Sequence, residues 1–324
     1  MSRLLILLTL PAEVTAQYRA RLGKLFPELE IDVVSQREQA PTALAKADAL
    51  LTFGQMMKNL KLGLEGADKL KWVQALGTGL DGITDQPALK PSVTVTSLHG
   101  VHGAPVSEAA MAGMLALSRD IPRFARNQDT RTWGRWPAKL LHEKTVGILG
   151  IGVIAEALAP KCKAFGMTVV GITSAKRQLA SFDSMHGIDE LPAVLPQLDY
   201  LVLLTPYSPA THHMIDAKVF AAMKPTAYLI NVARGGVVDD AALIKALREG
   251  RIASAGLDVF EGEPKLNEGF LRLENAVLTP HIASATASTR DAMAQLAIRN
   301  VVEALAGRRP PTLLNPQAWD NRRR

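Results

Sequence analysis

Three polar side chains, Arg234, Glu263 and His281, each come after an apolar run that predicts a buried strand. Because the carboxyl ends of parallel strands meet along one rim of a sheet, we expect the three groups to converge there. A guanidinium binds a carboxylate and polarises a neighbouring carbonyl, while an imidazolium, oriented by a carboxylate, protonates a forming alkoxide. Taken one at a time, Arg234 could form a surface ion pair, Glu263 could be a turn residue, and His281 could form a hydrogen bond at a strand end. Together they suit hydride reduction of a keto acid.

A glycine loop earlier in the chain indicates the source of the hydride. An apolar strand leads into Gly150-x-Gly152-x-x-Ala155, and a helical segment and a second strand, 168–172, follow. Gly150 permits a tight turn, Gly152 lets backbone N–H groups approach a pyrophosphate, and Ala155 allows close helix–strand packing. The helix N-terminus adds partial positive charge. The residues predicted to contact a dinucleotide are Gly150, Ile151, Gly152, Val153 and Ile154.

The segment after residue 172 bears on which nicotinamide cofactor binds. Where an NAD-binding domain carries an acid for the ribose 2′-hydroxyl, this chain has Thr173, followed by Ser174, Lys176 and Arg177. Two hydroxyls and two cations can bind a 2′-phosphate, and no carboxylate is present to repel it. The sequence therefore favours NADP(H) over NAD(H). The alternative, that Lys176 and Arg177 are ordinary exposed charges, stays open.

These residues are positioned by strand and helix signals that alternate along the whole chain, which predicts an α/β fold with two doubly wound parallel sheets. The predicted strands are residues 4–10, 31–34, 49–53, 72–75, 93–96, 145–149, 168–172, 200–204, 228–232, 254–257 and 276–278. Predicted helices include 107–117, 240–248 and 291–305. The glycine-rich loop 99–105 is interpreted as a crossover between domains, with Ser107 as an N-cap-type residue.

Length and composition fit this architecture. A chain of 324 residues with 48% hydrophobic and 21% charged residues suits two globular domains. No apolar run approaches the ~20 residues of a membrane span. The run 4–10 follows Arg3 and is ended by Pro11, so it is interpreted as a first buried strand rather than a signal peptide. Cys162, the only cysteine, is expected in the core and suits a reducing cytoplasm.

The formal net charge of +6 raises the possibility of a nucleic-acid partner. The basic residues are scattered, however, and their one tight cluster is the terminal 322–324. We therefore expect no nucleic-acid partner, and a basic surface that attracts small anions.

Four segments in this order and spacing resemble the D-isomer-specific 2-hydroxyacid dehydrogenases, the group that contains glyoxylate/hydroxypyruvate reductases, D-lactate dehydrogenases and phosphoglycerate dehydrogenases. They are Gly150-Ile-Gly152, Asn231-Val-Ala-Arg-Gly-Gly236, Leu257-Asp-Val-Phe-Glu-Gly-Glu-Pro264 and Thr279-Pro-His281. The resemblance implies reduction of a small 2-oxo acid to a D-2-hydroxy acid, and a homodimer. We expect a Rossmann cofactor domain, residues 105–286, inserted into a flavodoxin-like substrate domain, residues 1–104 and 287–324.

The resemblance also implies residue roles. Arg234 would bind substrate, His281 would be the acid/base, and Glu263 rather than Glu261 would be its partner. Asp258 would support the site beside the cofactor. Four further positions would line the cofactor, namely Thr205, Pro206, Val232 and Ala233.

In the first domain, the resemblance implies a glycine loop whose backbone N–H groups bind the substrate carboxylate as an anion nest, at Leu76, Gly77 and Thr78. No metal site is expected. The crossover departs from the family pattern, because it carries His102 and Gly103 where an apolar residue and a threonine are usual. His102 is interpreted as a hinge residue.

Other residues are given ordinary structural interpretations. His99, His212 and His213 have no partner pattern and are expected on the surface or in loops, while Trp133 and Trp136 are expected as interface or core anchors. Alternatives from other classes remain: a nucleotide-sensing interaction protein or corepressor on the same scaffold, and oxidation of formate, phosphonate or phosphoglycerate within the same fold.

Overall fold

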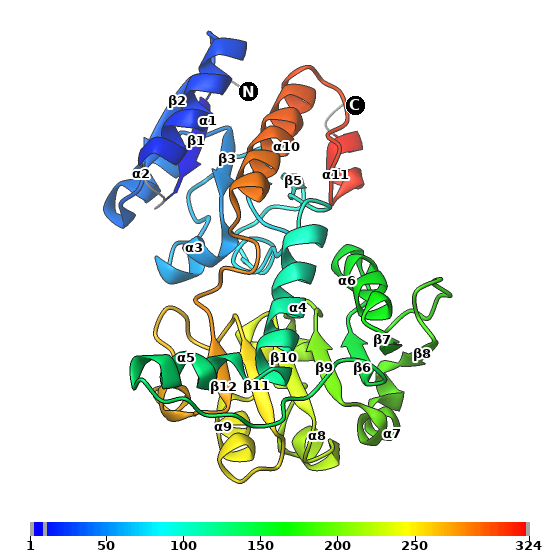
Figure 1. Cartoon of the computed structure of the whole chain (residues 1–324). Helices are drawn as coiled ribbons and strands as arrows, with labels where there is room; N and C mark the ends of the chain where they lie inside the picture. Colours follow the sequence, from blue (N-terminus) through cyan, green and yellow to red (C-terminus); the bar gives the residue numbers. More distant parts are fainter. Residues whose placement is uncertain (1–2, 9–11, 322–324) are drawn as a thin grey trace. The chain divides into compact units, whose positions relative to one another are not determined.

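The computed structural model describes residues 3–8 and 12–321. The chain forms two compact units: residues up to Val101 together with those from Ala287 onward, and His102–Thr286. Figure 1 shows the first unit in blue to cyan and in orange to red, and the second unit in green through yellow to light orange. Residues 9 and 10 of the first predicted strand, and the arginine cluster 322–324, lie outside the described residues.

The first unit contains a five-stranded sheet in which all neighbouring strands are parallel. Its order, β2-β1-β3-β4-β5, is the flavodoxin-like order of a doubly wound sheet. The strands are β1 (Arg3–Leu7), β2 (Glu30–Val34), β3 (Ala49–Thr52), β4 (Trp72–Ala75) and β5 (Thr94–Thr96). The helices are α1 (Ala12–Leu25), α2 (Ala40–Leu44), α3 (Gly54–Asn59), α10 (Ala287–Leu305) and α11 (Pro316–Asn321).

Alternation along β1 shows why this sheet has a core on each face. Leu5 and Leu7 pack into one buried cluster, while Leu4, Ile6 and Leu8 pack into another. Successive side chains of a strand point to opposite faces, so a continuous apolar run requires cover on both sides. α10 supplies part of that cover, since Ala297 and Val301 belong to the same cluster as Leu4.

The second unit contains a seven-stranded parallel sheet of order β12-β11-β10-β9-β6-β7-β8. Its strands are β6 (Thr145–Leu149), β7 (Thr168–Thr173), β8 (Ser184–Gly187), β9 (Tyr200–Leu203), β10 (Tyr228–Asn231), β11 (Ser254–Leu257) and β12 (Ala276–Leu278). The chain order reverses between β6 and β9, which is the switch point where Rossmann folds bind dinucleotides. The predicted fold class is therefore confirmed.

Helices cover both faces of this second sheet. Residues of α4 and α6 pack in one buried cluster, and residues of α7, α8 and α9 pack in another. The helices are α4 (Gly103–Ser118), α5 (Ile121–Asp129), α6 (Val153–Ala164), α7 (Leu191–Val194), α8 (Ala217–Ala222) and α9 (Asp240–Arg248). The short 3₁₀ turns of the chain are η1 (Arg37–Gln39), η2 (Ile188–Glu190), η3 (Leu195–Gln197), η4 (Pro209–Thr211), η5 (Gly235–Val237) and η6 (Phe270–Arg272).

Several local predictions were wrong. α4 begins at Gly103, so Ser107 is not its N-cap; the Ser107 hydroxyl lies inside the helix and donates to the Ala104 carbonyl oxygen at 2.9 Å. β8 has no counterpart among the predicted strands, because it lacks an apolar run; three of its four residues are half-buried. Trp133 is 93% exposed, which excludes the core anchor among its two expected roles, while the interface anchor stays a prediction.

Two other expectations concern burial. Cys162 lies fully buried, and this burial raises the pKa of its thiol to about 12. Trp136 stacks on Phe124 and donates its indole N–H to Asp120.

No helix within residues 3–8 and 12–321 combines the length and apolar character needed to span a bilayer.

Candidate active site

The glycine loop after β6 requires glycine at its first position. Gly150 has φ +98°, and a Cβ there would lie 2.5 Å from the Thr205 backbone nitrogen. Its own N–H donates to the Ile172 carbonyl oxygen at 2.9 Å. The loop that follows β6 therefore lies against the last residues of β7 and against the loop that follows β9, at the switch point of the sheet.

The next glycine opens this loop toward solvent. Gly152 is the N-cap of α6, and a Cβ built on it would meet no atom of residues 3–8 or 12–321 within 4 Å. The N-terminus of a twelve-residue helix beside open space offers N–H donors and partial positive charge. The cradle fits a dinucleotide pyrophosphate. Of its predicted contacts, Val153 is exposed and Ile151 and Ile154 are half-buried.

The end of β7 carries the residues predicted to choose between cofactors. Thr173 is buried, and its hydroxyl accepts a long hydrogen bond, 3.4 Å, from the Ala175 N–H. Ser174 is exposed just beyond it. The side of the loop nearest the strand therefore presents hydroxyl groups and no carboxylate.

The two cations of this loop have partners that the sequence did not indicate. Lys176 forms an ion pair with Glu190 of η2, and Arg177 forms one with Glu156 of α6. The hydrogen bond from Lys176 is the largest cause that lowers the pKa of Glu190 to about 2. Each cation of the loop is thus already paired with a carboxylate. A 2′-phosphate would have to compete with these two carboxylates for them.

Backbone hydrogen bonds link the ends of β10, β11 and β12. The Asp258 N–H donates to the Asn231 carbonyl oxygen at 2.9 Å, and the His281 N–H donates to the Asp258 carbonyl oxygen at 2.8 Å. The Asn231 side chain also donates to the Arg234 carbonyl oxygen at 3.3 Å and accepts from the Ala233 N–H at 3.1 Å. The segments that carry Arg234 and His281 are thus attached to one rim.

Gly235 allows the loop after β10 to approach the loop after β11. A Cβ at Gly235 would fall 1.8 Å from the Phe260 carbonyl carbon, an overlap that no rearrangement of side chains relieves. The neighbouring Arg234 is half-buried, and its Nη1 donates to the Ala233 carbonyl oxygen at 2.7 Å. Glycine is therefore required beside the candidate substrate-binding arginine for steric reasons.

His281 and Glu263 form the central contact of the site. His281 Nδ1 lies 2.7 Å from Glu263 Oε2, and Glu263 Oε1 accepts the Phe260 N–H at 2.8 Å. The Glu263 side chain is 17% exposed and that of His281 is 37% exposed. The carboxylate is thus shielded and held at both oxygens, while the imidazole reaches solvent. With Nδ1 directed at Glu263, Nε2 is the atom available to carry a transferable proton.

The turn that presents His281 is held by a buried carboxylate. Asp258 accepts hydrogen bonds from the Thr279 hydroxyl at 2.6 Å and from the N–H groups of Ile282 and Ala283 at 2.8 and 2.9 Å. His281 itself has φ +55°, an uncommon conformation for a non-glycine residue. Asp258 therefore fixes a strained turn around the imidazole, and its contact with a cofactor stays a prediction.

The remaining cofactor positions follow β9 and β10. Thr205 lies buried against Gly150, and the Pro206 carbonyl oxygen accepts the Thr211 hydroxyl at 2.9 Å. Val232 is half-buried and Ala233 is buried. They follow strand ends of the same sheet as the glycine loop, and their contact with the cofactor stays a prediction.

In the first unit, the predicted anion nest follows β4. The Leu76 N–H donates to the Thr52 carbonyl oxygen at 2.8 Å, so that donor is already used in the sheet. Gly77 is half-buried and Thr78 is exposed beyond the strand end. The prediction of a substrate-carboxylate contact therefore centres on Gly77 and Thr78.

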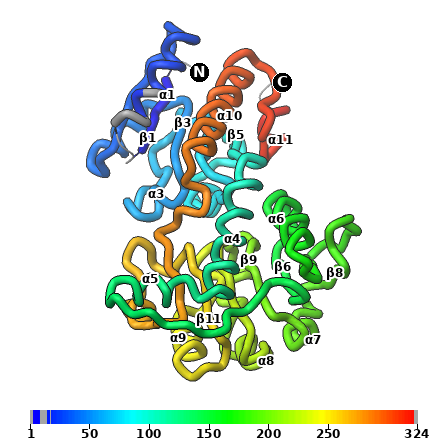
Figure 2. The backbone as a smooth tube through the Cα atoms, viewed as in Figure 1, coloured from blue at the N-terminus to red at the C-terminus, as the bar shows by residue number. Residues whose placement is uncertain are grey.

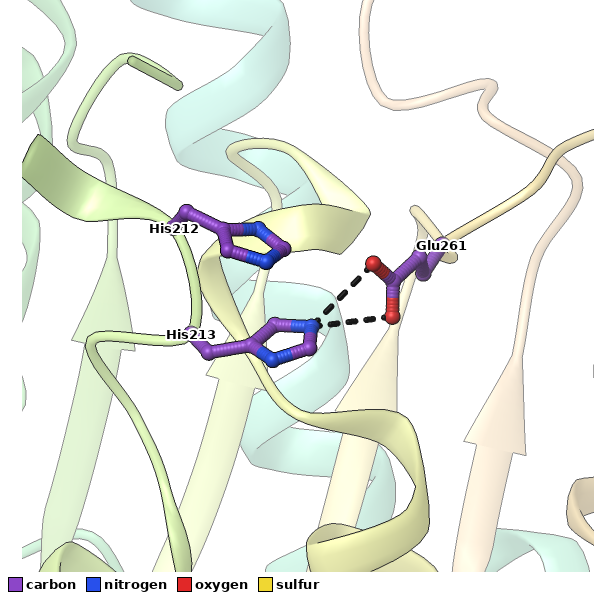
Figure 3. Close-up of side chains that lie close together, drawn as sticks. All are labelled: His212, His213 and Glu261. Atoms are coloured by element: carbon purple, nitrogen blue, oxygen red, sulfur yellow. Dashed lines mark hydrogen bonds and ion pairs between the residues drawn. The ribbon is translucent and has the colours of Figure 1, made fainter. Parts of the chain in front are cut away.

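Two histidines that the sequence left without partners have them. His213 Nε2 lies 3.0 and 3.1 Å from the two carboxylate oxygens of Glu261, and the His212 ring stacks on the His213 ring (Figure 3). Nearby, burial and then repulsion from Glu261 raise the pKa of Asp240 to about 7. Glu261 and Glu263 lie in one turn but contact different imidazoles, those of His213 and His281.

Sequence reasoning gave no role to the side chains that hold these groups in place. Asn231 is 1% exposed at the end of an apolar strand, and its isolated polarity there was the available signal. The Thr279 hydroxyl offered no comparable signal, because its bond to Asp258 joins positions 21 residues apart.

Comparison with known proteins places this geometry in a family. The model of the D-isomer specific 2-hydroxyacid dehydrogenase NAD binding domain matches residues 111–283. A glyoxylate reductase of Pyrococcus furiosus is 36% identical over 310 residues, which cover 91% of this chain and 92% of the relative. Both matches are to dehydrogenases or reductases, so the alternative of a nucleotide-sensing interaction protein or corepressor is not favoured.

Solved structures agree over nearly the full length. A D-isomer specific 2-hydroxyacid dehydrogenase family protein from Aeromonas salmonicida has a TM-score of 0.82 at 31% identity, covering 97% of this chain and 99% of the other. An NADPH-dependent glyoxylate/hydroxypyruvate reductase from Sinorhizobium meliloti, in complex with NADP and malonate, has a TM-score of 0.84 at 29% identity, covering 97% and 96%. The chain belongs to the D-isomer specific 2-hydroxyacid dehydrogenases, NAD(P)-dependent oxidoreductases that interconvert 2-oxo acids and D-2-hydroxy acids.

Proposed function

We propose that this protein reduces a small 2-oxo acid of the glyoxylate or hydroxypyruvate type, with His281 as the proton donor. The observation that carries the proposal is the 2.7 Å contact between His281 Nδ1 and Glu263 Oε2, which leaves Nε2 to face a substrate. The glyoxylate reductase relative and the glyoxylate/hydroxypyruvate reductase structure support this substrate class.

The protein's part in the reaction is to bind, orient and protonate. When bound, the nicotinamide would supply the hydride for C2 of the 2-oxo acid. The Arg234 guanidinium binds the substrate carboxylate and polarises the carbonyl. The proton that completes the alcohol moves from His281 Nε2 to the carbonyl oxygen, and Glu263 stabilises the imidazolium until that transfer.

The proposed roles of the two units follow from their loops. The second unit would hold the cofactor at residues 150–154, near residues 173–177 and along the ends of β9 and β10. The first unit would supply Gly77 and Thr78 for the substrate carboxylate. This keeps the expected division into a cofactor domain, 105–286, and a substrate domain, 1–104 with 287–324. The family match over residues 111–283 supports the first assignment.

NADP(H) is the proposed preferred cofactor. Support comes from Thr173 and Ser174 at the end of β7, where a carboxylate would repel a 2′-phosphate, and from Lys176 and Arg177 beside them. The ion pairs of both cations with Glu190 and Glu156 weaken this support, since each cation already has a negative partner. The preference therefore depends mainly on Thr173.

The test of the proposed function is replacement of the proton donor. In His281→Ala, we expect NADPH-dependent reduction of glyoxylate and hydroxypyruvate to fall at least about 100-fold in kcat, because general acid catalysis contributes on this scale. Cofactor affinity, measured by NADPH fluorescence, should stay within a factor of two to three.

The matched control for this test is His142→Ala, which removes an exposed imidazole that also lies near a glutamate, Glu143, at 3.7 Å. It should leave both turnover and cofactor affinity unchanged. Normal turnover in His281→Ala would refute the assignment of the proton donor. Failure of the wild-type protein to reduce any 2-oxo acid with NADH or NADPH would refute the proposed substrate class.

A homodimer is proposed from apolar side chains on the segment around α5. Ile121 is 54% exposed, Trp133 93% and Leu140 59%. Figure 2 shows the backbone after α5 running as an extended stretch before it enters β6. Exposed apolar side chains that form one patch mark protein interfaces, and we propose that these three form such a patch. Sedimentation analysis should show a dimer that Trp133→Ser weakens; a monomer at all concentrations would contradict the proposal.

A cytoplasmic location is also proposed. Cys162, the chain's single cysteine, is buried as a free thiol, which suits a reducing compartment. Fractionation of the native cells tests this location. Recovery of the protein in the cytoplasmic fraction would support it, and recovery mainly in another fraction would contradict it.

A further inference from the structure

A second cluster of potential ligands lies beside the candidate active site. His212 and His213 follow η4, and Glu261 follows β11, 48 residues further along the chain. One ligand atom from each of the three side chains lies within 4.8 Å of the other two. Figure 3 shows both rings and the carboxylate facing the same small volume. The sequence predicts no metal site here, because adjacent histidines with no third ligand near them in the chain match no known ligand spacing.

From this geometry we propose that His212, His213 and Glu261 bind one divalent transition-metal ion, with Zn²⁺ as its representative. Two imidazole nitrogens and one carboxylate oxygen are ligands that suit Zn²⁺, Cu²⁺ and Ni²⁺, whereas Mg²⁺ and Ca²⁺ prefer oxygen ligands throughout. Water would fill the remaining coordination position.

The distances require little rearrangement. Zinc bonds of about 2.1 Å in a tetrahedral site place ligand atoms roughly 3.4 Å apart. His213 Nε2 and the two oxygens of Glu261 are already 3.0 and 3.1 Å apart. Only the His212 ring has to turn inward, and it is exposed on the surface, where such a rotation is unhindered by the core.

Contacts outside the cluster hold the two histidines, His212 through its ring and His213 through its backbone. The Tyr207 hydroxyl lies 3.2 Å from His212 Nδ1, which leaves His212 Nε2 for the metal. The His213 N–H donates to the Gly236 carbonyl oxygen at 2.9 Å and fixes that residue's backbone. His213 is thus attached to η5, which follows β10, the strand between β9 and β11 in the sheet.

The cluster is open to an ion from solvent and distinct from the reaction site. The His213 side chain is 34% exposed and that of Glu261 is 42% exposed. Glu263, two residues beyond Glu261, is engaged with His281 instead. A bound ion would link the loop after β9 to the turn after β11 and so stabilise the folded unit against unfolding, while the candidate catalytic pair keeps its own contacts.

The experiment uses tag-free full-length protein without cofactor or substrate. Calorimetric titration with Zn²⁺ should give one ion per chain at micromolar affinity, and Co²⁺ should give visible absorption bands from nitrogen and oxygen ligation. His213→Gln and Glu261→Gln should each weaken binding more than about tenfold, since loss of one ligand outweighs loss of an outer contact. The increase in melting temperature with Zn²⁺ should disappear in both variants.

His142→Gln is the matched control, because it removes another exposed histidine that lies near a glutamate. It should bind Zn²⁺ as the wild-type protein does. Two results would overturn the proposal: no stoichiometric Zn²⁺ binding by the wild-type protein, which would make His213 and Glu261 an ordinary ion pair, or unchanged binding in both ligand variants, which would place the ion elsewhere. Neither result bears on the proposed reductase activity.

Discussion

The Nδ1 atom of His281 lies 2.7 Å from Oε2 of Glu263, and the second oxygen of that carboxylate accepts the Phe260 N–H. The carboxylate is therefore held from both sides before any substrate arrives. A fixed carboxylate orients the imidazole ring and stabilises its charge, two effects that require no rearrangement during the reaction.

Replacing Glu263 tests this relationship. Glu263→Gln keeps the shape of the side chain but removes its charge, so we expect kcat for 2-oxo acid reduction to fall about 100-fold. Cofactor affinity should be unchanged, and KM should change much less than kcat. Glu268→Gln, an exposed residue further along the same loop, is the control and should behave as the wild-type protein. Near-normal kcat in Glu263→Gln would show that the contact is incidental.

The cofactor preference is tested at Thr173. In Thr173→Asp, a carboxylate would face the 2′-phosphate, and such like-charge contact costs several kcal/mol. The ratio of kcat/KM with NADPH to that with NADH should therefore fall about tenfold or more. Lys176→Ala should have a smaller effect, because Lys176 is already paired with Glu190. An unchanged ratio in Thr173→Asp would remove the basis for the NADP(H) assignment.

The two glycines of the cofactor loop should respond differently to alanine. Gly150→Ala forces a side chain into a positive-φ conformation and against the Thr205 backbone, so we expect a loss of unfolding free energy of at least about 2 kcal/mol.

Gly152→Ala meets open space on the protein side and should leave stability unchanged while raising the KM for the cofactor. Urea unfolding without cofactor, together with NADPH titration, measures both effects. Equal stability losses in the two variants would contradict the distinction between a packed and an open glycine.

Cys162 gives a pH-dependent prediction. Burial raises the pKa of its thiol to about 12, whereas an unfolded thiol ionises near about 8.5. The folded state thus keeps a proton that the unfolded state releases, so this group's contribution to stability is complete below about pH 8.5 and decreases as pH rises toward about 12.

When the pH is raised from 7.5 to 10, the unfolding free energy should therefore fall more in the wild-type protein than in Cys162→Ala. Thiol reagents should label the folded wild-type protein slowly at pH 8 and rapidly once it is unfolded. Rapid labelling of the folded protein would contradict this burial.

Much of the fold was predictable because its signals are local. The strands β4, β6 and β11 are short runs of mainly apolar or small residues with ends defined by their own neighbours, and all three were predicted at their observed bounds. β8 lacked such a run, and the start of α4 was misplaced because a polar Ser107 near a proline looks like a cap from the sequence alone.

The sequence by itself determined which reactive side chains follow strands: Arg234, Glu263 and His281, with the glycine loop before them. Only the tertiary structure decided their neighbours. It joined Glu261 to His213 and gave Lys176 a carboxylate partner, neither of which was predicted, and it set the Glu263–His281 contact that the family resemblance had implied. The physical reason is range: strand signals arise from adjacent residues, whereas these contacts join chain segments brought together only when the parallel sheet places separate strand ends along one rim.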